Sequence, residues 1–169
     1  RRQRQMCIRD RLNAYEPIVR PIANLLCFQG SRIGEAVCLR WRDVDLDGRR
    51  ITFWDTKNGD FRTVPMHLRV FESLRSIDRE RDGTVFLTHL GLPYTYTKIA
   101  SSSTIKTAHQ TALRRSGITN FKIHNWRSHW ASQMALKGAN QYELMALGGW
   151  RDAKSCLLYT SPSPRDSDS

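Results

Sequence analysis

Residues 49–65 read RRITFWDTKNGDFRTVP, and this stretch predicts a β-hairpin. Two runs rich in β-branched and aromatic residues stand on either side of Asn58-Gly59, and an Asn-Gly pair supplies the positive φ angles that a tight turn needs. Lys57 then lies at the tip of the hairpin. Helical periodicity surrounds this stretch, so the sheet is expected to be a small part of a helical framework.

Apolar residues at helical spacing dominate on both sides of the hairpin. Before it, residues 12–28 predict one amphipathic helix, with Pro17 or Pro21 as a local complication. Ser31 then predicts the N-cap of a second helix, which runs toward Trp41 and carries Arg32 in its first turn. After the hairpin, helices are expected around 70–74 and over 104–116, 124–136 and 141–147, with a buried segment at 84–87. No repeat or linker divides the chain, so the expected fold is one domain, mainly α with a small antiparallel β-sheet (α+β).

Composition places the chain among globular proteins. It has 169 residues, of which 40% are hydrophobic, and no apolar run approaches the roughly 20 residues that cross a bilayer. No signal peptide is recognisable, so no membrane association and a cytoplasmic location are expected. The four cysteines show no Cys-x-x-Cys spacing, which argues against a zinc site or a disulfide framework. Neither a metal nor a cofactor is therefore expected.

The net charge of the chain is strongly positive. It is +11 at pH 7, and a charge of this size favours a polyanionic partner through phosphate neutralisation and counterion release. The ends contribute to it: residues 1–11 hold five Arg and one Asp, and residues 156–169 hold one Arg and two Asp, which leaves +8 for the part between them. A solvated basic surface is the alternative, so charge alone does not establish nucleic-acid binding.

The two ends of the chain can be encoded by one DNA element. Residues 5–11 allow CAG ATG TGT ATA AGA GAC AG, and the reverse complement of the last part of that DNA encodes residues 156–161, Cys-Leu-Leu-Tyr-Thr-Ser. Both ends also resemble the translated ends of a transposon-type sequencing adapter. We therefore expect residues 1–11 and 156–169 to be non-native adapter translation, and residues 12–155 to be the domain.

Three separate boxes resemble the signature motifs of the tyrosine recombinases, or phage-type integrases. They are QGSRIGEA at residues 29–36, HNWRSH at residues 124–129 and LGGW at residues 147–150. Each box alone is weak, but three in the right order, with a lysine-bearing hairpin between the first two, make a specific pattern. The resemblance spans nearly all of residues 12–155 and implies the tyrosine-recombinase catalytic fold.

The resemblance implies that Arg32 and Arg127 hold the phosphate under attack. Two guanidinium groups can bind its non-bridging oxygens bidentately without losing their protons. Glu35 lies on the same helix face as Arg32 and resembles the acidic residue that orients the family's first arginine, although a helix-capping role is an equal alternative. Ordinary surface ion pairs are the alternative for both arginines.

Three further residues match positions that act on the phosphate in the family. Lys57 matches the hairpin lysine that protonates the leaving 5′-oxygen, with a solvated turn lysine as the alternative. His124 matches the histidine that shares the nucleophile's proton and contacts the phosphate. Trp150 occupies a His-or-Trp position, where its indole N–H can donate one hydrogen bond, or where the ring simply packs in the core.

Tyr159 stands nine residues beyond Trp150, at the family's spacing for the nucleophile, and is expected on the following helix. Its attack on phosphorus would leave a 3′-phosphotyrosine and a free 5′-hydroxyl, a step that requires neither ATP nor a metal. Because it lies in the adapter-like end, we expect the natural nucleophile to be a different tyrosine at nearly the same place. The expected catalytic set is therefore Arg32, Lys57, His124, Arg127, Trp150 and Tyr159.

The expected function is that of a site-specific recombinase or integrase catalytic domain acting on double-stranded DNA. The chain is expected to be a bacterial or prophage-encoded fragment, since nothing in it corresponds to the family's N-terminal DNA clamp. A tetramer is expected for the full-length protein. The alternatives are a catalytically inactive DNA-binding fragment and a type IB topoisomerase. A metal-dependent nuclease is the least favoured reading, because this sequence has no cluster of carboxylates spaced for two cations.

Overall fold

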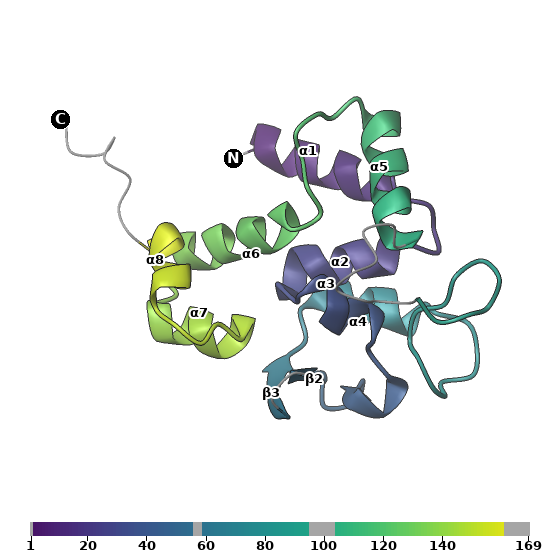
Figure 1. The fold of residues 1–169 in the computed structure, drawn as a ribbon, viewed down its shortest axis with the longest axis horizontal. Helices are drawn as coiled ribbons and strands as arrows, with labels where there is room; N and C mark the ends of the chain where they lie inside the picture. The colour runs from purple at the N-terminus through teal and green to yellow at the C-terminus, as the bar shows by residue number, and fades with distance from the viewer. Residues whose placement is uncertain (1, 56–58, 95–103, 161–169) are drawn as a thin grey trace.

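The computed structural model describes residues 2–55, 59–94 and 104–160 (Figure 1). Its elements follow in the order α1 (Arg2–Asn13), α2 (Arg20–Gln29), α3 (Ile33–Val37), the 3₁₀ turn η1 (Trp41–Asp43), β1 (Val44–Asp45), β2 (Arg50–Asp55), β3 (Asp60–Pro65), α4 (Leu68–Arg75), α5 (Thr104–Ser116), α6 (Asn125–Leu136), α7 (Gln141–Gly148) and α8 (Lys154–Thr160). The expected class, mainly α with a small antiparallel sheet, is confirmed. Within the described ranges, no helix combines the length and apolar character needed to cross a membrane.

Helix α2 lies at the centre of the main core. Apolar residues recur along it at helical spacing, and Ile22 and Leu25 are fully buried. Figure 1 shows α2 between α1 and α5 on one side and the hairpin on the other. Helices α4 and α6 pack against it. A second, smaller cluster joins α6, α7 and α8 around Trp130, Leu144 and Cys156, and the candidate site lies where the two clusters meet.

The sheet has the strand order β1-β2-β3, with both neighbouring pairs antiparallel. In the hairpin, Ile51 pairs with Val64 and Phe53 with Arg62. Strand β2 contacts α3, and strand β3 contacts α7. The two strands match the expected hairpin. Lys57 at its tip falls outside the described residues.

The expected single helix over 12–28 is wrong. Helix α1 ends at Asn13 and α2 begins at Arg20, with turns between them. Pro17 explains the break, because its ring nitrogen has no proton to donate to the carbonyl four residues earlier and its ring clashes with a continuing helix. Pro21, in contrast, lies in the first turn of α2, where a missing N–H costs nothing.

The expected helix from Ser31 toward Trp41 is also corrected. Helix α3 covers only Ile33–Val37, and Arg32, with extended backbone (φ −71°, ψ 152°), takes the N-cap position instead of the first turn. Ser31 is buried one residue earlier. Glu35 closes this end of the helix, because its Oε2 accepts a hydrogen bond from the Arg32 backbone N–H at 2.8 Å. Later helices agree more closely: α5 has the expected bounds, and α6 begins one residue after His124.

Candidate active site

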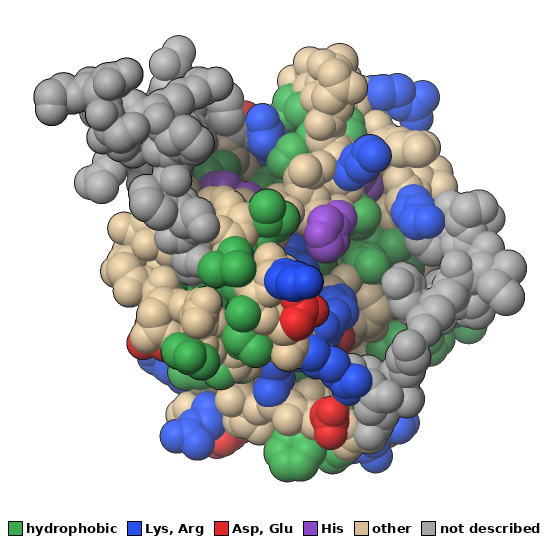
Figure 2. Space-filling model, turned by 60° about the vertical axis from the view of Figure 1, so that its left-hand side comes forward, with side chains coloured by type: hydrophobic (Ala, Val, Ile, Leu, Met, Phe, Trp, Pro, Cys, Tyr) green, Lys and Arg blue, Asp and Glu red, His purple; other side chains and the backbone are tan. Residues whose placement is uncertain are grey.

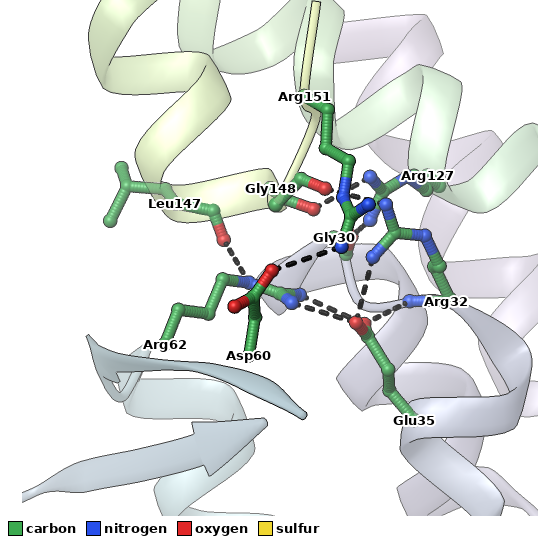
Figure 3. Close-up of polar contacts among 10 residues, drawn as sticks. Gly30, Arg32, Glu35, Asp60, Arg62, Arg127, Leu147, Gly148 and Arg151 are labelled. Atoms are coloured by element: carbon green, nitrogen blue, oxygen red, sulfur yellow. Dashed lines mark hydrogen bonds and ion pairs between the residues drawn. The ribbon is translucent and has the colours of Figure 1, made fainter. Parts of the chain in front are cut away.

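The carboxyl end of α7 organises the site (Figure 3). Asn140 caps the start of this helix by accepting hydrogen bonds from the backbone N–H groups of Tyr142 and Glu143, as expected. Gly149 ends it in the left-handed conformation, with φ at 70°. The last carbonyls of a helix lack intrahelical partners and carry the negative end of the helix dipole. Here arginine side chains from three other elements satisfy them.

Arg127, on the first turns of α6, is 3% exposed. Its Nη1 donates to the Gly30 carbonyl and its Nη2 to the Gly148 carbonyl, both at 2.6 Å. The guanidinium lies 4.0 Å from the centre of the Trp150 ring, a cation–π arrangement. Burial, and then the charge of Arg32, lower the pKa of Arg127 to about 10. It therefore remains a cation at neutral pH.

Arg32 binds the neighbouring carbonyl. Its Nη2 donates to the Gly149 carbonyl at 2.5 Å and its Nη1 to Glu35 Oε1 at 2.9 Å. Its side chain is 41% exposed and so remains accessible from solvent. Because Gly148 and Gly149 are adjacent, Arg32 and Arg127 lie side by side at one helix end. Both alternatives for Glu35 hold: its carboxylate orients the Arg32 side chain and also caps α3.

Trp150 and Tyr159 complete this face. The Trp150 ring lies between two aromatic neighbours, at 6.0 Å from Trp130 and 6.1 Å from Tyr159 between ring centres. Tyr159 lies on α8, the helix expected for it, and its hydroxyl donates to Ser128 Oγ on α6 at 3.0 Å. The residue that accepts the hydrogen bond from the tyrosine hydroxyl is therefore the one that follows Arg127 on α6.

His124 occupies the N-cap position of α6, one turn before Arg127, and is exposed. Figure 2 shows Lys and Arg side chains gathered near the middle of one face, with histidine side chains beside them. Four of the expected residues thus meet at one place: Arg32, Arg127, Trp150 and Tyr159. His124 stands at the same end of α6, and the expected position of Lys57 lies outside the described residues.

Two residues in this arrangement were missed from the sequence. Arg62 on β3 donates Nη1 and Nη2 to the two oxygens of Glu35, and Ser128 receives the Tyr159 hydroxyl. Strand alternation could have found Arg62, because it lies two residues before the buried Val64 and so points to the same face. Among the described residues, His, Cys, Asp and Glu form no group of three that could hold a metal ion.

The fold is that of a tyrosine-recombinase catalytic domain. It superposes on the catalytic domain of bacteriophage HP1 integrase with a TM-score of 0.70 and 23% identity, covering 95% of this chain and 88% of that one. It also superposes on the Tn1549 transposon integrase in complex with a circular intermediate DNA, with a TM-score of 0.71 and 18% identity, covering 88% of this chain and 56% of that one.

The sequence agrees with the fold. The model of the phage integrase family matches residues 8–165, and the chain belongs to this family. A curated relative, the tyrosine recombinase XerC of Xanthomonas campestris pv. campestris, is 27% identical over 141 residues, which are 83% of this chain and 43% of the relative. The chain therefore spans less than half the length of that relative.

Proposed function

We propose that this chain is the catalytic domain of a site-specific DNA recombinase or integrase, which breaks and rejoins DNA through a 3′-phosphotyrosine intermediate. One observation carries the proposal: Arg32 and Arg127 bind adjacent carbonyls at the end of α7, and Tyr159 lies against the same tryptophan as Arg127. A phosphate diester placed here would meet two cations and a tyrosine hydroxyl, which are the groups needed for transesterification.

In the proposed first step, the Tyr159 oxygen attacks phosphorus, the bond to the 5′-oxygen breaks, and a 3′-phosphotyrosine forms. Arg32 and Arg127 neutralise the charge that develops on the non-bridging oxygens. His124 takes the tyrosine proton, and Lys57 gives a proton to the leaving oxygen. Trp150 donates its indole N–H to the phosphate. Attack by a 5′-hydroxyl on the phosphotyrosine reverses these events and reseals the strand.

The fixed orientation of the two arginines supports this role. Backbone carbonyls at the negative end of a helix hold them, and cations oriented in this way need little reorganisation during the reaction. The substrate in this proposal is double-stranded DNA, and the basic charge of the chain supports it. The full-length protein would act as a tetramer in the cytoplasm of a bacterium.

Covalent capture tests the proposal. Duplexes with a randomised centre and a nick would trap a cleaved strand, because the short fragment that carries the new 5′-hydroxyl diffuses away and cannot reseal the bond. We expect a protein–DNA adduct that survives denaturing electrophoresis and disappears in Tyr159→Phe. Tyr142→Phe is the matched control, since Tyr142 is exposed on α7 and should leave the adduct unchanged. Salt-sensitive binding without any adduct would instead indicate a DNA-binding fragment.

A second proposal concerns the origin of Tyr159. Residues 5–11 and 156–161 can be encoded by one DNA element in inverted orientation, so the natural domain is proposed to cover 12–155 and to continue into another tyrosine-bearing helix. Sequencing the uninterrupted gene tests this. A different coding sequence after Ser155, with a tyrosine at a similar distance from Trp150, is the expected result. Finding the same codons for 156–161 in the genome would refute it.

A further inference from the structure

Arg62 is a cation placed next to the phosphate site and yet turned away from solvent. It lies in the middle of β3, opposite Phe53, and its side chain is 13% exposed. Its guanidinium lies 4.8 Å from the centre of the Phe53 ring. The aromatic ring covers one side of the guanidinium plane, so the N–H groups at its edge are directed to a few fixed acceptors.

These acceptors are Glu35 and α7. Nη1 and Nη2 of Arg62 donate to the two oxygens of Glu35 at 2.7 and 2.8 Å, a bidentate pair. Its Nε donates to the Leu147 carbonyl at 3.0 Å. A Cβ on Gly149 would lie 2.6 Å from Arg62 Nη1, which shows how closely the guanidinium packs under the end of the helix. Arg62 thus joins three elements: the hairpin, α3 and α7.

Glu35 depends on this contact. Its side chain is 6% exposed, and it also accepts hydrogen bonds from the Arg32 backbone N–H and from Arg32 Nη1. Burial opposes ionisation of Glu35, but the hydrogen bonds and charge of Arg62, followed by those of Arg32, outweigh it and hold the pKa below its ordinary value. Without Arg62, the buried carboxylate would keep only one cationic partner among these contacts.

Three arginines therefore bind three consecutive carbonyls at the end of α7 (Figure 3). Arg62 binds that of Leu147, Arg127 that of Gly148 and Arg32 that of Gly149. Only Arg62 has both ends of its fork on a carboxylate. Its charge is thus neutralised locally, whereas Arg32 remains accessible from solvent.

We propose that Arg62 is a positioning residue for the phosphate site: it fixes Glu35 and the end of α7, and these two in turn orient Arg32 and Arg127. This inference rests on the proposed function for its catalytic consequence, but its geometric content stands alone. Arg62 does not touch the phosphate in this proposal. Lysine cannot replace it, because an ammonium group cannot donate along two parallel directions to Glu35 and also reach Leu147.

The test compares Arg62→Lys and Arg62→Met with Arg50→Met, which removes an exposed arginine from the neighbouring strand of the same hairpin. The first measurement is the ¹⁵N–¹H spectrum of the arginine Nε–H groups, with Arg32 and Arg127 assigned by their own Lys variants. We expect both signals to move in Arg62→Lys while the backbone amide spectrum is retained, and to stay in Arg50→Met. Unchanged signals in a folded Arg62→Lys protein would overturn the proposal.

The second measurement is the rate at which the protein cleaves a nicked duplex of the sequence identified by covalent capture. The scissile position of this duplex carries either a normal phosphate or a methylphosphonate group. We expect Arg62→Lys to cleave the normal duplex on the order of 100-fold more slowly, as misplaced catalytic groups do, with duplex affinity within about twofold. The deficit should shrink on methylphosphonate, because there is less charge for Arg32 to neutralise. Equal deficits on both substrates would refute a positioning role.

The two measurements separate the possible failures. If the wild-type protein forms no adduct with DNA, the proposed function is refuted. The spectrum of the arginine Nε–H groups would still decide whether Arg62 orients Arg32 and Arg127. If Arg62→Met does not fold, Arg62→Lys decides, since it keeps the charge and most of the side-chain volume.

Discussion

Arg127 is an arginine at 3% exposure, where this residue type is rarely found without partners. The Gly30 and Gly148 carbonyls and the Trp150 ring supply them. Its motif identified Arg127 from the sequence, because the flanking residues are characteristic. Arg62 carries no such motif. Strand alternation places it on the same face as the buried Val64, but its acceptors on α3 and α7 become visible only when these elements come together.

The conformation of Gly30 is a further residue-scale requirement. Gly30 and Gly117 both adopt the left-handed conformation, at φ 64° and 65°. A Cβ at Gly30 would lie 2.2 Å from the Trp130 ring, whereas at Gly117 it would meet nothing within 4 Å. We expect Gly117→Ala to lower the free energy of unfolding by about 1–2 kcal/mol, the cost of the conformation alone. Gly30→Ala should cost roughly 1–3 kcal/mol more through overpacking.

Urea denaturation of both variants measures this difference. Gly117→Ala is the control for backbone strain, so the difference between the two variants isolates the contact with Trp130. Equal losses would show that the ring moves aside at no cost. Because Gly30 also supplies a carbonyl to Arg127, Gly30→Ala should reduce DNA cleavage beyond its effect on stability.

At the scale of elements, sequence pattern predicted what local chemistry determines. The hairpin strands, α5 and the Asn140-capped α7 were found because Asn-Gly turns, 3.6-residue periodicity and side-chain caps act over a few residues. The two helices before the hairpin are shorter than the sequence pattern predicts. Apolar spacing continues through residues 14–19 and 38–41 because Tyr15, Val19, Leu39 and Trp41 are buried outside any α-helix. Periodicity does not distinguish such buried turn residues from those of a buried helix.

Helix α7 carries a prediction at this scale. Asn140→Ala removes the side chain that accepts the N–H groups of Tyr142 and Glu143, and loss of such a cap costs about 1 kcal/mol. The cost should appear in the free energy of unfolding measured by urea. Gln141→Ala alters the next residue without touching the cap and should change stability far less. An unchanged free energy of unfolding in Asn140→Ala would mean that Glu143, and not Asn140, supplies the stabilising cap at the start of α7.

At the scale of the whole molecule, the net charge of +11 has a measurable consequence. Affinity for a random duplex should fall linearly, on logarithmic axes, as salt concentration rises, by a factor on the order of 10³ between 50 and 200 mM if about six phosphates are contacted. Arg32→Gln should reduce the slope by about 0.9 if its guanidinium contacts one phosphate. Fluorescence anisotropy checks both. Affinity independent of salt would contradict phosphate binding as the source of affinity.

A buried polar network ties the helical half of the molecule together. Tyr15, in the link between α1 and α2, accepts a hydrogen bond from Trp126 Nε1 on α6 at 3.0 Å, and its hydroxyl contacts His109 Nδ1 on α5. His109 Nε2 donates to the Phe121 carbonyl at 2.8 Å. With Nε2 donating to the carbonyl, a neutral His109 ring accepts a hydrogen bond from the Tyr15 hydroxyl at Nδ1, and burial favours this neutral form. Spacing alone could not predict this network, because its members lie about 100 residues apart.

The network makes stability depend on pH. Burial lowers the pKa of His109 below its ordinary value of 6.5, and the Phe121 carbonyl offsets this only in part. Below about pH 6.5 the unfolded chain therefore binds a proton that the folded chain binds less well, and the free energy of unfolding decreases as pH falls. In His109→Gln the amide can still accept from Tyr15 but does not titrate. The free energy of unfolding of His109→Gln should be lower than that of the wild type at pH 7.5 and should change less between pH 7 and pH 5, as measured by urea denaturation at each pH.

Identical pH profiles for the wild type and His109→Gln would place the proton uptake on another group. His67, whose pKa burial also lowers, would then be the next residue to replace.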